Sequence, residues 1–179
     1  NADNIIEVIP ATSRESVFKM DLSGNRNMGL YFNHNTANPF VIGDYTLKST
    51  NGTGNTLIFI NDGVVTLKPT NTGGVQNTLA ITGGSGNIGI FAKGSGDTLT
   101  TGADITIANS DNSTGIFAQN TGTVTNTGNI STSGASVKAI IADSTTVNST
   151  GNITVNGTAL STLDGSAGLV AQNGGTLNI

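Results

Sequence analysis

Residues 115–130 read Gly-Ile-Phe-Ala-Gln-Asn-Thr-Gly-Thr-Val-Thr-Asn-Thr-Gly-Asn-Ile, in which short apolar segments alternate with Gly, Asn and Thr. The opening tetrad, residues 115–118, has three counterparts that begin at Gly89, Ala139 and Gly168. The four tetrads are spaced by 26, 24 and 29 residues. Self-similarity at such a period is typical of repeat architectures, in which each repeat forms one structural unit.

Two further apolar anchors follow each tetrad. In the repeat quoted above, the second anchor is Val124, which lies in a Thr-rich segment, and the third is Ile130, six residues later. The second anchors of the four repeats are Leu99, Val124, Val147 and Leu177, the third anchors are Ile105, Ile130 and Ile153, and the residues before these are Asp104, Asn129 and Asn152. Each repeat therefore contains up to three short apolar segments in a constant order.

Three short strands separated by Gly and Asn turns are what a triangular coil requires, because Gly and Asn adopt left-handed conformations at low cost. The repeat predicts an all-β fold, a right-handed parallel β-helix with three strands per coil. The constant step between the second and third anchors predicts one tight corner. Since successive coils lie about 4.8 Å apart, we expect the Asp and Asn residues before the third anchors to stack in a ladder. We also expect Phe91, Phe117 and Ile141 to stack in one internal row, because they hold the same place in their tetrads.

The first half of the chain fits the same repeat less regularly and brings the total to about six coils. One coil is predicted from residues 29–32, 40–41 and 45–47, and the next from residues 57–60, 64–67 and 79–82. In the earlier coil, Val41 and Leu47 are assigned to the second and third anchor places, because they too are six residues apart.

Residues 1–26 differ in kind from the repeats, since they hold seven of the 18 charged residues. A solenoid needs a polar terminal cap over its exposed core and strand edges. We therefore divide the chain into an N-terminal cap, residues 1–26, and parallel β-helix repeats, residues 27–179. The cap residues expected to cover the core are Ile5, Val8, Val17, Phe18 and Leu22.

The composition excludes several partners. Thr, Gly, Asn and Ser make up 91 of the 179 residues, only 10% are charged, and the net charge is −4. Seven Lys and Arg residues do not form the basic surface that nucleic acids require, so no nucleic-acid partner is expected. No apolar run approaches the roughly 18 residues of a membrane helix, so no direct membrane insertion is expected. The absence of Cys excludes disulfides and thiolate metal sites.

Two Gly-rich segments have the form of ligand-binding motifs. Residues 84–89 match the dinucleotide string Gly-x-Gly-x-x-Gly, but a predicted strand follows where pyrophosphate would need a helix N-terminus. Residues 94–99 resemble one calcium-binding nonapeptide, but no copy recurs nine residues away to complete a shell shared between stacked turns. We interpret both as corners, and His34, the single histidine, as a surface residue. No cofactor and no metal ion is predicted.

Catalysis by acids and bases needs clustered ionisable groups. The chain has no Arg after Arg26, and most of its remaining carboxylates are expected in turns. These carboxylates are Asp44, Asp62, Asp97, Asp104, Asp111, Asp143 and Asp164. We therefore predict no catalytic residue and no enzymatic activity. The alternative is a carbohydrate hydrolase that uses two of these aspartates.

Residues 86–179, and residues 27–85 more loosely, resemble the passenger repeats of type V (classical, monomeric) autotransporter adhesins of Gram-negative bacteria. The resemblance implies export through the periplasm, passage through an outer-membrane β-barrel formed by the C-terminus of the same polypeptide, and display on the cell surface. It supplies no catalytic residues. Because the chain stops at Ile179, between the second and third strands of a coil, we expect it to be a fragment of a longer passenger.

The expected function is that of an adhesin, which attaches to a protein or glycan on host or partner bacterial cells or self-associates. A structural stalk that projects a distal binding domain and a cytotoxin-type passenger are the alternatives, and a β-helix polysaccharide-degrading enzyme is the last. No binding residue is assigned from the sequence.

Overall fold

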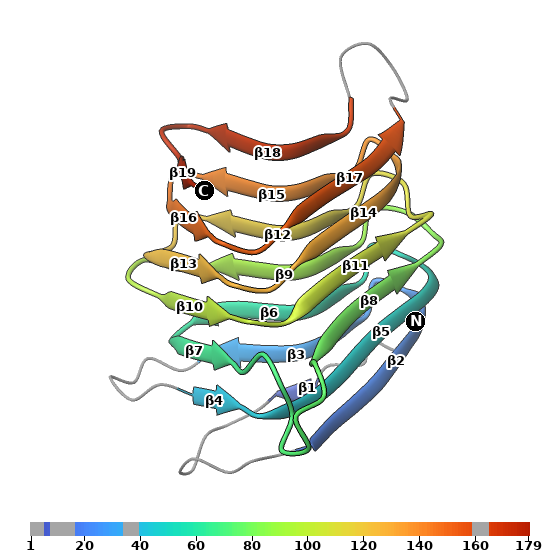
Figure 1. Cartoon of the computed structure of the whole chain (residues 1–179), viewed down its shortest axis with the longest axis horizontal. Helices are drawn as coiled ribbons and strands as arrows, with labels where there is room; N and C mark the ends of the chain where they lie inside the picture. Colours follow the sequence, from blue (N-terminus) through green and yellow to red (C-terminus); the bar gives the residue numbers. More distant parts are fainter. Residues whose placement is uncertain (1–5, 8–16, 34–39, 159–164) are drawn as a thin grey trace.

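A computed structural model of the chain describes residues 6–7, 17–33, 40–158 and 165–179. These residues form a β-solenoid of about six turns, built from three parallel sheets, and they contain no helix (Figure 1). The all-β parallel β-helix predicted from the repeat is therefore confirmed. Each coil runs through the three sheets in turn, which we call the first, second and third sheets.

The strands stack in three sheets of seven, six and six members. The first sheet contains β1 (Ile6–Glu7), β3 (Met28–Asn33), β6 (Thr56–Asp62), β9 (Ile88–Lys93), β12 (Thr114–Gln119), β15 (Lys138–Asp143) and β18 (Ala167–Gln172). The second contains β4 (Phe40–Ile42), β7 (Val64–Leu67), β10 (Thr98–Thr101), β13 (Thr123–Asn126), β16 (Thr146–Ser149) and β19 (Thr176–Asn178). The third contains β2 (Val17–Asn25), β5 (Asp44–Thr53), β8 (Thr78–Thr82), β11 (Asp104–Ala108), β14 (Ile130–Ala135) and β17 (Ile153–Thr158).

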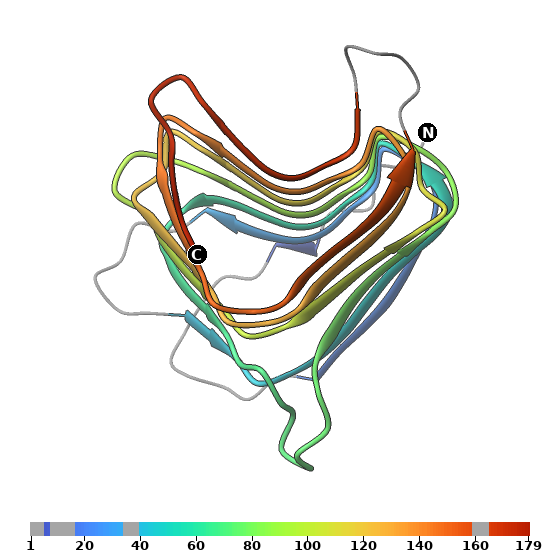
Figure 2. The same ribbon diagram turned by 45° about the horizontal axis from the view of Figure 1, so that its top comes forward.

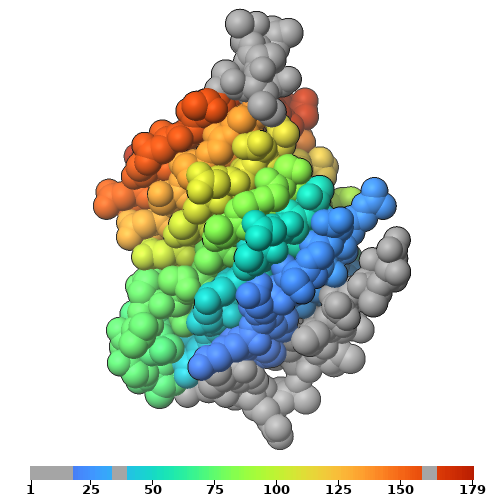
Figure 3. Space-filling model, turned by 90° about the vertical axis from the view of Figure 1, so that its right-hand side faces the viewer, coloured from blue at the N-terminus to red at the C-terminus, as the bar shows by residue number. Residues whose placement is uncertain are grey.

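The register follows the sequence repeat. Ile116 pairs with Ile90 in the coil before it and with Ile140 in the coil after it. The second and third anchors align in the same way, as Val124 with Leu99 and with Val147 shows. Figure 3, a view of the third sheet, shows successive coils as adjacent parallel bands.

One anchor assignment in the first coil is wrong. Phe40, and not Val41, aligns with Val65, the second anchor of the next coil. Leu47 aligns with Leu79, as expected for the third anchor. Phe40 packs on Phe32, with ring centroids 5.2 Å apart. Since Phe40 and Leu47 are seven residues apart, this coil has one residue more between its second and third anchors than the six-residue step of the later repeats.

The core is a set of apolar rows that run along the solenoid axis. Inward side chains such as Ile58, Ile90, Ile116 and Ile140 are fully buried, each with 0% exposure. Each of these isoleucines pairs with an isoleucine one coil away, so the row buries apolar surface continuously along the solenoid. Burial of apolar area is the main stabilising contribution to folding.

The prediction that Phe91, Phe117 and Ile141 form an internal row is wrong, because the row lies on the outer side of the sheet. The three residues do align, but they are only half-buried on the outer face, whereas Ile90 and Ala92 on either side of Phe91 are buried. Figure 2 shows that the first sheet bows toward the interior. Because Ile90 and Ala92 are buried, strand alternation directs the intervening Phe91 outward.

The tight corner predicted between the second and third sheets is formed by glycines. A Cβ atom added to Gly128 would overlap the carbonyl oxygen of Ala103, and one added to Gly151 would overlap that of Gly128. The constant six-residue step therefore reflects close backbone stacking at this corner. The coil of β7 and β8 instead carries an inserted loop, which projects from the corner in Figure 2.

Replacing Gly128 by alanine is expected to destabilise the chain by about 1 to 3 kcal/mol, because the methyl group meets backbone that is held by the stacked coil. Chemical denaturation would measure the change. Gly165→Ala is the matched control, since no atom of the described residues lies within 4 Å of its added Cβ and its effect should stay within about 0.5 kcal/mol. Equal losses in the two variants would contradict the tight corner.

A buried polar ladder connects the coils where the third sheet turns into the first. Asn27 N–H donates to Asn55 Oδ1 at 2.8 Å, Asn55 N–H donates to Asn87 Oδ1 at 2.9 Å, and Asn87 N–H donates to Ser113 Oγ at 3.0 Å. Asn55, Asn87 and Ser113 each have 0% exposure. The side chains thus satisfy backbone donors that the turn leaves without a strand partner, which a buried corner requires.

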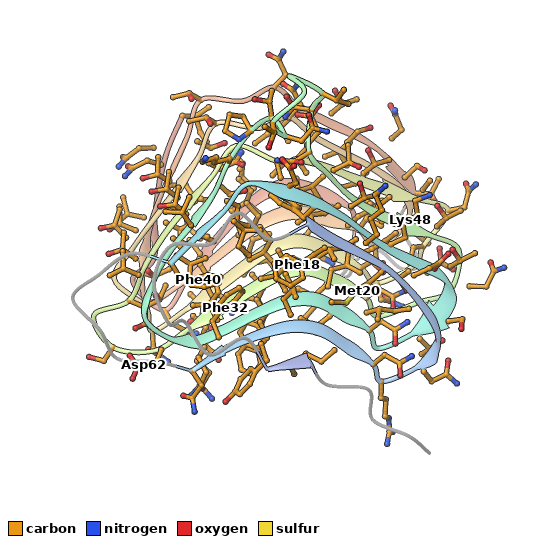
Figure 4. All side chains as sticks on the ribbon, turned by 90° about the horizontal axis from the view of Figure 1, so that it is seen from below. Phe18, Met20, Phe32, Phe40, Lys48 and Asp62 are labelled. Carbon is orange, nitrogen blue, oxygen red and sulfur yellow. The ribbon has the colours of Figure 1, made fainter. Side chains whose placement is uncertain are left out.

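Within the predicted cap, the described parts are strands that continue two of the sheets. β1 pairs with β3, and β2 pairs with β5. Leu22 is buried and Phe18 packs against the core, as expected. Figure 4, viewed from the N-terminal end, shows Phe18 beside Phe32 and Phe40 inside the ring of strands. Ile5 and Val8 lie outside the described residues, the Val17 side chain is not described, and the cap assignment stays a prediction.

Candidate binding surface

The outer face of the second sheet is a regular, uncharged surface. Its strands contain no charged residue, and their outward side chains form two parallel rows. One row consists of Val64, Thr98, Thr123, Thr146 and Thr176, and the other of Val41, Thr66, Thr100, Thr125, Asn148 and Asn178. We call these eleven residues the threonine face.

The spacing of the threonine face follows from strand geometry. Neighbouring coils place equivalent side chains about 4.8 Å apart, and outward residues within one strand are about 6.6 Å apart. Thr123 and Thr176 are exposed and Thr98 and Thr100 are half-buried, while Leu99 between the latter two points into the core. The face therefore offers hydroxyl and methyl groups to solvent at regular intervals on a rigid support.

The outer face of the first sheet carries a row of aromatic rings. The ring centroids of Tyr31 and Phe59 are 5.4 Å apart, and those of Phe59 and Phe91, and of Phe91 and Phe117, are 5.0 Å apart. The two Phe pairs are within 11° of parallel. Near-parallel rings at this distance form offset stacks, in which the edge of each ring lies over the face of its neighbour. The row continues as Ile141 and forms an apolar strip on the outer face of the sheet.

The outer face of the third sheet is polar and partly charged. The ladder predicted from the residues before the third anchors is confirmed, because Asn129 N–H donates to Asp104 Oδ1 at 2.9 Å and Asn152 N–H donates to Asn129 Oδ1 at 3.1 Å. Asp21 and Lys48 also lie on this sheet and are exposed. Figure 4 shows Lys48 outside the ring of strands.

Asp143 connects neighbouring coils at the end of the first sheet. Its carboxylate accepts hydrogen bonds from Asn173 Nδ2 at 2.7 Å, and from Gln172 Nε2 and Gln119 Nε2 at 3.1 Å each. The amides of Asn173, Gln172 and Gln119 hold the pKa of Asp143 below its ordinary value, because they stabilise the charged form. This arrangement is saturated with donors, and we assign it a structural role.

The other aspartates named from the sequence are dispersed. Asp44 accepts hydrogen bonds from the backbone and hydroxyl of Thr72, and Asp111 accepts one from the backbone of Ala135. Among the residues that the structure describes, no three His, Cys, Asp or Glu side chains come together. His34 and Asp164 lie outside those residues. The strand β9 starts at Ile88, so the motif of residues 84–89 runs directly into a strand, as predicted, and presents no helix N-terminus.

Asp62 and Asp97 are the exception, because the fold brings them together at the corner between the first and second sheets. Asp97 is 3% exposed, and its Oδ1 accepts a hydrogen bond from Gly63 N–H at 2.7 Å. Burial raises the pKa of Asp97, the Gly63 hydrogen bond opposes this rise, and the adjacent Asp62 carboxyl adds to it. Asp62 itself is half-buried and lies at the corner in Figure 4.

Comparison with protein-family models, curated proteins and solved structures gives no match. No helix capable of crossing a membrane occurs in the described parts of the chain. Function is therefore inferred from the surfaces described above.

The sequence analysis did not identify the buried polar ladder or the contact of Asp62 with Asp97, and only the ladder left a signal in the sequence. The buried ladder shows as Asn27, Asn55, Asn87 and Ser113, each placed two residues before the start of a tetrad or its equivalent. The contact of Asp62 with Asp97 left no such signal, because insertions between coils make their 35-residue separation irregular.

Proposed function

We propose that this chain is part of an autotransporter-type adhesin passenger, exported through the periplasm and displayed outside the outer membrane. It attaches there to a protein or glycan on host or partner bacterial cells, or to a second copy. The repeat that resembles such passengers and the β-solenoid support the proposal. A rigid solenoid suits this role, because it presents the same groups many times along one axis.

The observation that carries the proposal is the threonine face. Its hydroxyl groups both donate and accept hydrogen bonds, its methyl groups add apolar contact, and no charge interrupts it. Each contact is weak, but repeated groups on a rigid rod, and many rods on one cell, convert weak contacts into avidity. Attachment should therefore depend little on salt, since few ion pairs are available to be screened.

Displayed on a cell within a passenger, the chain is expected to promote self-aggregation or attachment to epithelial or bacterial cells, relative to cells that carry only the barrel. Thr66→Lys with Thr125→Lys places two charges on the threonine face, two coils apart, and should abolish most of this gain. The matched control, Thr106→Lys with Thr154→Lys, places the same charges with the same spacing on the third sheet and should retain it.

Sedimentation of cell suspensions and counts of attached cells measure the two effects, and surface labelling confirms equal display. No difference between displayed passenger and barrel alone would reject the adhesin proposal and favour the stalk. Equal losses in the two lysine variants would place the attachment surface away from the threonine face.

A further inference from the structure

Asp62 and Asp97 come from consecutive coils and face the same corner. Asp62 is the last residue of β6, and Asp97 immediately precedes β10. Because Thr98 aligns with Val64, Asp97 lies level with Gly63 and next to Asp62. The corner therefore joins a carboxylate of one coil to a carboxylate of the coil before it.

The Asp97 side chain is incompletely satisfied. Its Oδ2 atom is buried and has no hydrogen-bond partner in the described structure, although Oδ1 is bound by Gly63 N–H. A buried carboxylate oxygen without a partner is costly, so such atoms are exceptional and point to a missing proton, water or ion. The described groups that act on this carboxyl are the Gly63 amide and the Asp62 carboxyl, and neither is a cation.

A second oxygen, the main-chain carbonyl of Asn61, lies close to Asp97 Oδ2. Gly94 has φ +142°, and a Cβ atom added to it would overlap both Asp97 Oδ2 and the main-chain carbonyl oxygen of Asn61. Because Gly94 has no side chain, both oxygens lie against its backbone and close to one another. Carboxylates together with main-chain carbonyls are the ligands that calcium prefers, with water completing its shell.

We propose that Asp97, Asp62 and the main-chain oxygen of Asn61 form a low-affinity calcium site at this corner. Residues 94–99 resemble a single calcium-binding nonapeptide, which lacks a partner in the sequence, and Asp62 supplies the second carboxylate from the preceding coil. A divalent cation coordinates Asp97 Oδ2. Its positive charge also attracts both carboxylates and so offsets the repulsion between them. With only three protein oxygens, the dissociation constant should lie near about 1 mM, within the range of extracellular calcium modules.

Thermal unfolding and titration calorimetry of the full chain, freed of metal with a chelator at neutral pH, test the site. Calcium at about ten times the dissociation constant should raise Tm by about 3 to 6 °C, because it binds the folded state. Sodium chloride at matched ionic strength should not. Magnesium should bind more weakly, since it demands a more regular octahedral shell and gives up water reluctantly.

Asp97→Asn should abolish both the Tm shift and the binding heat. Asp62→Asn leaves the hydrogen bond between Gly63 and Asp97 in place, so it should fold, and it should weaken calcium binding by about tenfold or more. Asp21→Asn removes an exposed carboxylate on the third sheet and should behave as the unaltered chain does.

Absence of calcium-specific binding in the unaltered chain would overturn the proposal. A proton shared by the carboxyls of Asp62 and Asp97 would then explain the buried Oδ2 atom. Unchanged binding in Asp62→Asn would also overturn it.

Discussion

Replacing Asn55 by alanine is expected to lower the free energy of unfolding by about 3 to 6 kcal/mol. Asn55 has 0% exposure, and its side chain holds three groups at once. Its Oδ1 accepts from Asn27 N–H at 2.8 Å, and its Nδ2 donates to Gly24 O at 3.0 Å and to Ser49 Oγ at 2.8 Å. Alanine leaves these partners without a hydrogen bond, at about 1 to 3 kcal/mol for each one that stays buried.

Chemical denaturation measures this loss, and Asn129→Ala is its matched control. Asn129 makes the same kind of contact, since its Oδ1 accepts from the backbone of Asn152 at 3.1 Å in the next coil, but it is exposed. Water replaces the lost hydrogen bond there, so Asn129→Ala should cost less than about 1 kcal/mol. Similar losses for the two variants would mean that the Asn55 corner admits water and that the ladder is not a buried structure.

The second large effect is a difference between the stability losses at two adjacent residues of one strand, Ile116 and Phe117. Ile116→Ala should cost about 2 to 5 kcal/mol, because Ile116 is fully buried between Ile90 and Ile140 and its truncation leaves a cavity. Phe117→Ala should cost only about 1 to 2 kcal/mol, although phenylalanine is larger. Phe117 is half-buried on the outer face, and its main loss is the stack with Phe91.

The same denaturation experiment measures both variants, and the order of the two losses is the informative result. A loss for Phe117→Ala that equals or exceeds the loss for Ile116→Ala would show that the aromatic row lies inside the solenoid. Far-ultraviolet circular dichroism controls for the fold, since both variants should keep the β-sheet spectrum.

Periodicity in the sequence was sufficient to predict the class of fold, the three strands per coil, the register and the tight corner. In a parallel solenoid, each residue stacks on its equivalent one repeat away, so spacing along the chain converts directly into position in space. The alignment of Ile90, Ile116 and Ile140 and the ladder of Asp104 and Asn129 follow in this way. The first coil was predicted less accurately, because one extra residue before Leu47 places the second anchor at Phe40 instead of Val41.

Three other features depend on distances between residues in the folded chain, which the spacing of residues along the sequence does not determine. The side taken by Phe91 and Phe117 was determined by core packing, which buries the adjacent Ile90 and Ile116, because strand alternation by itself allows either residue of each pair to point inward. The burial of Asn55 depends on how closely the corner packs, since its composition alone equally suits an exposed turn. The meeting of Asp62 and Asp97 arises because the coils stack at one strand spacing, which brings residues from different repeats into contact across loops of unequal length.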